Sequence, residues 1–205
     1  MNIDTTKSAP VMTIGVGGAA GDGVREAAVH VAEFAKRLGH HAFLAFYYPS
    51  LIRGGHNFGR VSYSTDQVYA DHQDLDVLIS VNADSVKIRA GECKADATII
   101  VESAYLEEAK KYAPSVLGVP MNEVAKELNA PHAAAPSVGI GAYAYVTGLT
   151  KEELVQVLPE VFSDLVGGRE LNIALALRGF DAAAASGFPV RSTLRTATDG
   201  VAVGN

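Results

Sequence analysis

The stretch Tyr47-Tyr48-Pro49-Ser50-Leu51-Ile52-Arg53-Gly54-Gly55-His56-Asn57 combines residues of special backbone behaviour with polar side chains. Pro49 fixes φ and removes a hydrogen-bond donor, whereas Gly54 and Gly55 can take φ values that other residues avoid. The polar groups that we expect to face a ligand belong to Ser50, Arg53, His56 and Asn57. A long surface turn without a ligand is the alternative interpretation.

Both flanks of this stretch predict strands. The apolar, aromatic-rich run 41–48 precedes it, and the alternating run 58–64 follows it. Open α/β sheets bind ligands at loops that follow the carboxyl ends of their strands. The 47–57 stretch is therefore the first candidate site. A hairpin is also predicted between 58–64 and 67–70, with Thr65-Asp66 at its turn.

A second unusual stretch, Gly17-Gly18-Ala19-Ala20-Gly21-Asp22-Gly23, lies upstream and contains four glycines in seven residues. It follows the strand candidate 11–16 and precedes apolar residues at helical spacing over 24–38, with Gly39 as a stop. Backbone N–H groups in such a turn can hold an anion. Alternatively, Gly18, Gly21 and Gly23 only permit a tight turn with close packing. Both interpretations stay open here.

NAD binding is disfavoured by the second strand. A dinucleotide-binding fold needs an acidic residue at the end of that strand to hold the ribose hydroxyls. Here the strand ends in Tyr47-Tyr48-Pro49-Ser50, which has no carboxylate. The spacing from Gly18 to Gly23 also departs from the G-x-G-x-x-G pattern.

The rest of the chain predicts further strands and then helices. Strands are expected at 75–81, 97–101 and 116–120, the first being a buried parallel strand by its aliphatic run. Asn82-Ala83-Asp84-Ser85 begins a short helix to about Ala90. Capping is the favoured role of Asn82 and Asp84, and contact with a ligand at the carboxyl end of the strand is the alternative. Later helices are expected at 121–128, 138–145, 151–165 and 171–180. The third follows a capping box of Thr150 and Glu153, has an apolar face and ends at Gly167-Gly168. That face comprises Leu154, Val155, Leu158, Val161, Phe162 and Leu165.

These elements predict a three-layer α/β/α, Rossmann-like fold with a mostly parallel sheet and a helical C-terminal region. The expected organisation is a flexible segment 1–10, one domain over 11–180 and a linker or arm over 181–205. At 205 residues, the chain is long enough to bury a proper core.

Composition excludes several classes of protein. With 48% apolar and 20% charged residues and a net charge of -6, the chain is predicted to be globular and not to bind nucleic acid. Cys93 is the single cysteine, so an internal disulfide, an iron–sulfur site or a zinc site built by this chain alone is disfavoured. No signal peptide or membrane span is predicted, which favours the cytoplasm. The histidines do not occur at the spacing of metal ligands. The sequence also contains no nucleophile elbow and no Walker lysine, so we predict no catalytic or metal-binding residue in this chain.

Four stretches together are similar to a known family: Gly18–Gly23, Tyr48–Asn57, Asp76-Val77-Leu78-Ile79 with Asn82, and Asn172–Gly179. Over about residues 11–180, the chain resembles the gamma domain of 2-oxoacid:ferredoxin (acceptor) oxidoreductases. The type that it resembles most is fused to the front of the alpha subunit in 2-oxoglutarate:ferredoxin oxidoreductases.

The resemblance implies an activity that this chain shares with partner subunits. Such enzymes convert a 2-oxoacid, coenzyme A and oxidised ferredoxin into acyl-CoA, CO2 and reduced ferredoxin. Thiamine diphosphate, Mg and iron–sulfur clusters belong to partner subunits, so this chain binds none of them alone. The implied partners are alpha and beta subunits and, through the complex, ferredoxin.

Within such a complex, the resemblance implies that the gamma domain shapes the substrate and coenzyme A side of the cavity. Residues facing that cavity would be Ser50, Arg53, Gly54, Gly55, His56 and Asn57, with Gly18, Gly21 and Gly23 forming the turn. An arginine suits this place because its planar fork pairs with a carboxylate or a phosphate.

The tail 199–205 resembles the opening of the pyrimidine-binding domain that follows in the fused type, yet the chain stops there. We therefore expect either a separately encoded gamma subunit or a piece of a larger subunit, inactive by itself. Two alternatives are a stand-alone nucleotide- or flavin-binding α/β module and a non-catalytic docking domain.

Overall fold

The computed structural model describes residues 9–48, 55–162 and 167–191. Within them, six strands form one sheet in the order β2-β3-β1-β4-β5-β6. The strands are β1 (Met12–Ala19), β2 (His41–Tyr47), β3 (His56–Ser64), β4 (Leu75–Ser80), β5 (Cys93–Glu102) and β6 (Val116–Val119). The pairs β1–β4, β4–β5 and β5–β6 are parallel, whereas β3 is antiparallel to both β1 and β2. The predicted mostly parallel sheet is confirmed, with one reversed strand.

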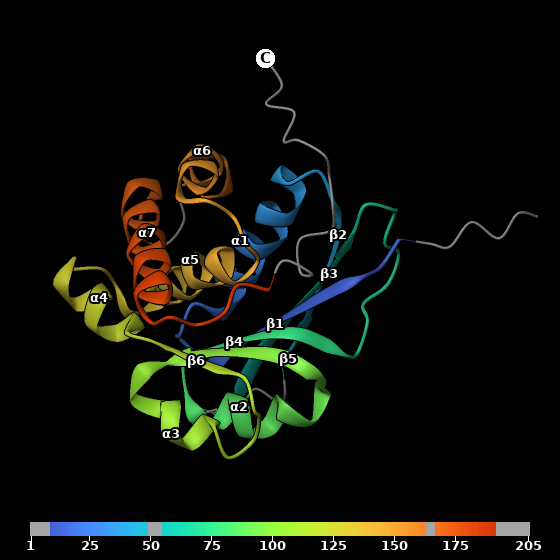
Figure 1. Cartoon of the computed structure of the whole chain (residues 1–205), viewed down its shortest axis with the longest axis horizontal. Coiled ribbons are helices and arrows are strands. Elements are labelled where there is room, and N and C mark those ends of the chain that lie inside the picture. Colours follow the sequence, from blue (N-terminus) through green and yellow to red (C-terminus); the bar gives the residue numbers. More distant parts are fainter. Residues whose placement is uncertain (1–8, 49–54, 163–166, 192–205) are drawn as a thin grey trace, which may run out of the picture.

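Helices cover both faces of the sheet (Figure 1). One face carries α1 (Val24–Arg37), α4 (Met121–Glu127), α5 (Pro136–Val146), α6 (Lys151–Val161) and α7 (Arg169–Ala185). The other face carries the shorter α2 (Ala83–Arg89) and α3 (Leu106–Ala109). Val77 and Ile79 of β4 point into the larger core, while Leu78 between them points into the smaller one. This alternation confirms the three-layer α/β/α prediction.

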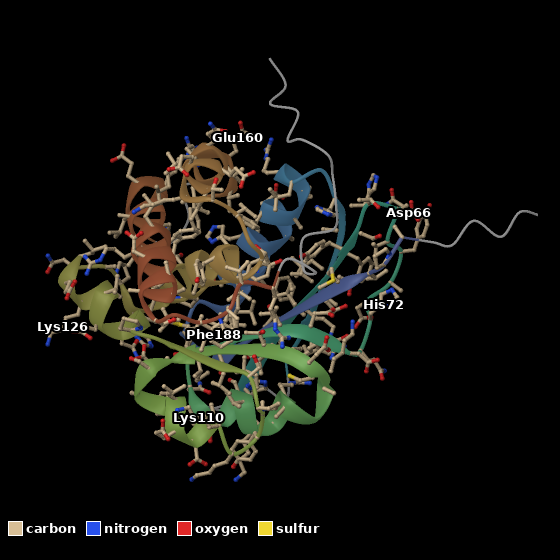
Figure 2. All side chains as sticks on the ribbon, in the orientation of Figure 1. Asp66, His72, Lys110, Lys126, Glu160 and Phe188 are labelled. Atoms are coloured by element: carbon tan, nitrogen blue, oxygen red, sulfur yellow. The ribbon has the colours of Figure 1, made fainter. Side chains whose placement is uncertain are left out.

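The hairpin predicted between 58–64 and 67–70 is wrong. β3 pairs with β1 on one side and with β2 on the other, so it has no free edge for 67–70, and these residues form no strand. The 65–74 connection instead folds over β3, where the His72 amide donates to Ser62 Oγ at 3.0 Å. Asp66 and His72 lie at the periphery of the molecule (Figure 2). The real hairpin joins β2 to β3, and its connection is the 47–57 stretch.

Some boundaries and one helix face also differ from expectation. β1 extends to Ala19 because Ala19 pairs with His56 of β3. On α6, Val155 is 49% exposed while Val157 is buried, and Leu165 of the predicted face lies outside the described residues. α7 continues to Ala185, so the alanine-rich residues 181–185 are helical and do not belong to an arm, consistent with the high helix propensity of alanine.

Local signals for helix starts are confirmed. Thr150 and Glu153 form the predicted capping box at α6, with the Thr150 side chain accepting from the Glu153 amide and Glu153 accepting from the Thr150 amide. Asn82 caps α2 by accepting from the amide of Ser85. Of the helices in the described ranges, none is long and apolar enough to cross a bilayer.

Candidate functional site

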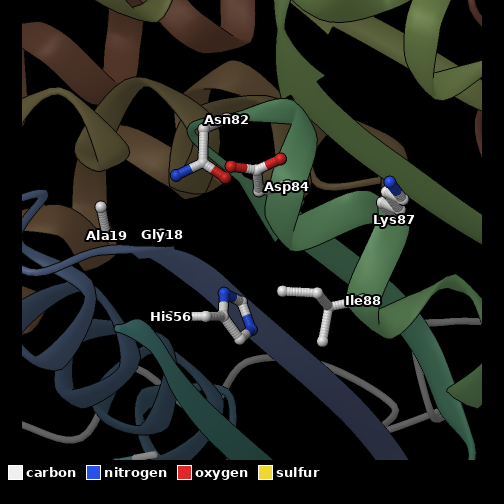
Figure 3. A pocket seen from close by; sticks show the side chains of 7 residues that line it. All are labelled: Gly18, Ala19, His56, Asn82, Asp84, Lys87 and Ile88. Atoms are coloured by element: carbon white, nitrogen blue, oxygen red, sulfur yellow. The ribbon is translucent and has the colours of Figure 1, made fainter. Parts of the chain in front are cut away.

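A pocket of about 450 Å³ opens at the carboxyl ends of β1 and β4, beside the beginning of β3. The residues that line it are Gly18, Ala19, His56, Asn82, Asp84, Lys87 and Ile88 (Figure 3). Its volume lies within the usual range for ligand sites, and its position at the carboxyl ends of parallel strands is where open α/β sheets bind ligands. The fold thus brings Gly18 of the glycine-rich stretch and His56 of the 47–57 stretch to one pocket.

The other predicted site residues fall in different places. Gly55 directly precedes β3, and Asn57 lies opposite Gly18 in the β1–β3 ladder. Ser50, Arg53 and Gly54 lie outside the described residues, so their predicted role stays a prediction. Tyr47 ends β2 and His56 begins β3, so both described ends of the stretch lie at the carboxyl edge of the sheet, as predicted.

Lys87 and Ile88 were not predicted as site residues. Both lie on α2, three and four residues after Asp84, and this spacing places the three on one helical face. Within the described chain, Lys87 makes no hydrogen bond or ion pair. Ile88 is 53% exposed and forms part of the pocket wall. Once Asn82 is recognised as the cap, this helical spacing is the signal that could have found them.

His56 is held on both sides by its own chain. The Nε–H of Arg89 donates to His56 Nε2 at 3.1 Å, and Nδ1 lies 3.1 Å from Ser85 Oγ. Because the arginine group can only donate, Nε2 carries no proton and the proton resides on Nδ1. Burial, and then the positive charge of Arg89, lower the pKa of His56. Neither nitrogen is free to exchange a proton with a ligand.

Asn82 is occupied by the same network. Its Oδ1 accepts from the Ser85 amide at 2.9 Å and from the Ser85 hydroxyl at 2.8 Å. Its Nδ2 donates to Asp22 Oδ2 at 3.3 Å. The Asn82 side chain therefore links α2 to the glycine-rich turn by hydrogen bonds, and its main role is to cap α2.

The glycine-rich turn contains a negative charge of its own. Asp22 Oδ2 accepts from the Ala19 amide at 2.7 Å, and Asp22 Oδ1 lies 3.1 Å from His132 Nε2. An added anion would meet the Asp22 carboxylate at this place. Gly23 has φ 72°, and a Cβ there would come within 1.8 Å of the Ala133 carbonyl oxygen. These contacts favour the tight-turn interpretation over anion binding.

Comparing two alanine variants tests this packing role. Gly21 and Gly23 both have positive φ, but a Cβ at Gly21 would meet no atom within 4 Å. We expect Gly21→Ala to cost about 1 kcal/mol through backbone strain alone. Gly23→Ala adds a clash with backbone and is expected to cost about 1–2 kcal/mol more. Urea denaturation of both variants measures the difference; equal losses would contradict a packing role for Gly23.

The lone cysteine is poorly suited to nucleophilic chemistry. Cys93 is half-buried, and burial raises its pKa to about 11, so little thiolate exists at neutral pH. In the described part of the chain, no group of three or more histidine, cysteine or acidic side chains is arranged to hold a metal ion.

The open, mostly parallel sheet and the pocket at its carboxyl edge define an open α/β domain with a candidate ligand site at the usual place. More particularly, the chain belongs to the pyruvate ferredoxin/flavodoxin oxidoreductase family, whose family model matches residues 13–182. A comparison with curated proteins finds no match.

Solved structures with this fold include subunits of such enzymes. The gamma subunit of keto/oxoacid ferredoxin oxidoreductase from Geobacter sulfurreducens PCA matches with a TM-score of 0.66 at 23% identity, over 85% of this chain and 99% of that chain. Pyruvate oxidoreductase subunit PORC from Thermotoga maritima matches with a TM-score of 0.61 at 17% identity, over 83% of this chain and 96% of that chain.

The third structure is a larger chain. The 2-oxoglutarate:ferredoxin oxidoreductase from Magnetococcus marinus, with 2-oxoglutarate, coenzyme A and succinyl-CoA bound, matches with a TM-score of 0.66 at 19% identity. The match covers 85% of this chain and 31% of the Magnetococcus chain, so this chain spans about a third of it. At these identities, the three structures establish the shared fold.

Proposed function

We propose that this chain is the gamma-type subunit or domain of a thiamine diphosphate-dependent 2-oxoacid:ferredoxin oxidoreductase. The complete enzyme would convert a 2-oxoacid, coenzyme A and oxidised ferredoxin into acyl-CoA, CO2 and reduced ferredoxin. Alpha and beta subunits would be its partners, and ferredoxin would contact the complex. One observation supports the proposal most strongly. In a chain of this family, His56 of the 47–57 stretch and Gly18 of the glycine-rich stretch line the same pocket.

The chemistry of the pocket fits an accessory role. A volume of about 450 Å³ accommodates part of a molecule as large as coenzyme A, so a partner chain would enclose the remainder. Lys87 offers a cation at its rim that makes no ion pair with the described residues and is suited to a phosphate or a carboxylate. The His56 ring, whose orientation is fixed by the hydrogen bond from Arg89, forms part of the pocket wall.

The reaction centre is assigned to the partner subunits. There, thiamine diphosphate with Mg would supply the decarboxylation chemistry, and iron–sulfur clusters would carry the electrons. The described residues of this chain do not form a metal-ligand group, and the high pKa of Cys93 fits a structural thiol. The work of this chain would be to bind, orient and shield the substrate side of the cavity.

Reconstitution tests the proposal. We expect the purified chain alone to reduce no ferredoxin, and co-expression with alpha and beta subunits to give ferredoxin reduction that depends on both a 2-oxoacid and coenzyme A. Turnover by the single chain would contradict the proposal, as would a flavin or nucleotide retained on purification. The latter result would favour a stand-alone nucleotide-binding module.

The role predicted for Arg53 gives a sharper test in the assembled enzyme. Losing a charge-assisted, bidentate contact typically costs about 1.5–3 kcal/mol, so Arg53→Ala should lower kcat/KM for coenzyme A or the 2-oxoacid about 10- to 100-fold. The matched control is Arg178→Ala, because Arg178 pairs with Glu127 between α7 and α4. Unchanged kinetics would remove Arg53 from the site. Lost assembly with normal turnover per complex would indicate a docking domain instead.

A further inference from the structure

Glu92 lies at the centre of a cluster of charged side chains next to the pocket. It ends the short turn η1 (Ala90–Glu92) after α2, and its carboxylate binds two arginines from different elements. Glu92 Oε1 accepts from Arg89 Nη1 at 2.6 Å, and Glu92 Oε2 accepts from Arg60 Nη2 at 2.5 Å. One carboxylate therefore links α2 to the central part of β3.

The first arm of this cluster reaches His56. Arg89, whose side chain is 16% exposed, pairs with Glu92 through Nη1 and donates to His56 Nε2 through Nε. Its guanidinium also lies over the ring of Phe58, 4.2 Å from the centroid. With Nε2 held in this way and Nδ1 facing Ser85, the imidazole at the pocket wall has one orientation and one tautomer.

The second arm reaches Tyr47. The Arg60 side chain is only 6% exposed and donates through Nη1 to the Tyr47 hydroxyl at 3.2 Å and to Asp71 Oδ2 at 3.0 Å. The Tyr47 hydroxyl also donates to Asp71. Arg60 lies over the Tyr47 ring at 5.0 Å and over the Phe58 ring at 5.5 Å.

The two arginines share the Glu92 carboxylate. Both guanidiniums lie over one Phe58 ring, and two partly desolvated cations at such close quarters repel each other. Glu92 binds both and offsets that repulsion. Without its charge, Arg89 has no remaining carboxylate among its described hydrogen-bond partners, whereas Arg60 keeps Asp71.

We infer that Glu92 is a positioning residue of the candidate site: through Arg89 it fixes His56, and it also binds Arg60, which contacts Tyr47. Tyr47 ends β2 and His56 begins β3, so this one carboxylate is linked to both strands of the pair. The effect of Glu92 on the tautomer of His56 stands on the geometry alone. Its effect on turnover rests on the proposed function.

Nitrogen-15 NMR of the histidine side chains in the purified chain tests the geometric part. In the wild type, we expect a single His56 tautomer with the proton on Nδ1. Glu92→Gln removes the charge at nearly constant volume, so Arg89 is released and Nε2 can take the proton, while the Ser85 hydroxyl turns from Asn82 Oδ1 to donate to Nδ1. The tautomer with the proton on Nε2 therefore becomes populated. The matched control is Glu127→Gln, which removes another glutamate–arginine pair on the helices α4 and α7.

A second variant covers the case in which Glu92→Gln does not fold. Arg89→Met removes the arm to His56 while leaving Arg60, Tyr47 and Asp71 in contact. It should populate the second tautomer of His56 and raise the pKa of this histidine, because the positive charge of Arg89 contributes to lowering it. A wild-type tautomer in both variants would overturn the inference.

Kinetics of the reconstituted complex test the second part. Small misplacements at an active site can cost up to about 100-fold, so we expect Glu92→Gln to lower kcat/KM about tenfold and Glu127→Gln to leave it unchanged. A mixed tautomer with unchanged kinetics would overturn the positioning role of Glu92. A wild-type complex without coenzyme A-dependent turnover would refute the proposed function, and the NMR result would then decide the positioning of His56 by itself.

Discussion

Replacing Gly141 with alanine is expected to lower the free energy of unfolding by about 3 kcal/mol or more, although the same change in an ordinary helix is stabilising by about 0.5–1 kcal/mol. Gly141 lies inside α5, which crosses α7. A Cβ at Gly141 would come within 1.7 Å of the Ala176 carbonyl oxygen. Reciprocally, a Cβ at Gly179 of α7 would lie 1.9 Å from the Val138 carbonyl oxygen. Both obstacles are backbone atoms, so the helices themselves must separate.

Urea denaturation of Gly141→Ala measures this loss against Gly91→Ala. Gly91 lies in η1, where a Cβ would meet no atom within 4 Å and φ is not positive. The control variant should therefore be neutral or slightly stabilised. Stability at or above the wild type for Gly141→Ala would show that the two helices do not cross as closely as described.

The features that could be predicted from sequence are those with local causes. The aliphatic run of β4, the capping box before α6 and the cap at Asn82 each depend on residues within a few positions. Pairing across the sheet has no such local signature. The alternation of 58–64 predicted β3 correctly but could not reveal that β1 and β2 occupy both its edges, which is why the hairpin with 67–70 was predicted wrongly.

The candidate site divides in the same way. Gly18 and His56 belong to unusual stretches of sequence and do line the pocket, whereas Lys87 and Ile88 could be found only by their helical spacing from Asp84. The cluster around Glu92 could not be predicted, because Arg60 and Glu92 are 32 positions apart and meet only through the fold. The sequence shows that the glycine-rich turn contains Asp22. It does not show that the Asp22 carboxylate accepts a hydrogen bond from the Ala19 amide of the same turn.

The second large effect is a loss of folding stability at low pH, which we expect from the buried His30. His30 of α1 is 3% exposed, and its ring contacts Phe162 edge-on with centroids 4.7 Å apart. Among the described residues, neither of its ring nitrogens has a hydrogen-bond partner. Burial lowers the pKa of His30 to about 4, and the nearby Glu26 and Glu33 only partly oppose this. Protonating His30 in the folded state therefore places a charge in an apolar core.

The sign and range of the pH dependence follow from this lowered pKa. The unfolded chain takes up the proton near pH 6.5 and the folded chain only near pH 4, so the stability from a neutral His30 is complete above about pH 6.5. It is lost as the pH falls toward 4. At about 1.4 kcal/mol for each pKa unit, the loss amounts to about 3 kcal/mol at pH 4.

His30→Leu removes this group while keeping an apolar side chain of similar size. The difference in unfolding free energy between the wild type and His30→Leu, measured by urea denaturation at pH 7 and pH 4, should shift by about 3 kcal/mol in favour of the variant at pH 4. Comparing the two proteins at each pH cancels the acid sensitivity of the rest of the chain. His72→Leu, at an exposed position, controls for the loss of an imidazole in general. A difference that stays constant with pH would mean that His30 is solvated or paired in the folded protein, and would place the core beneath α1 and α6 in contact with water.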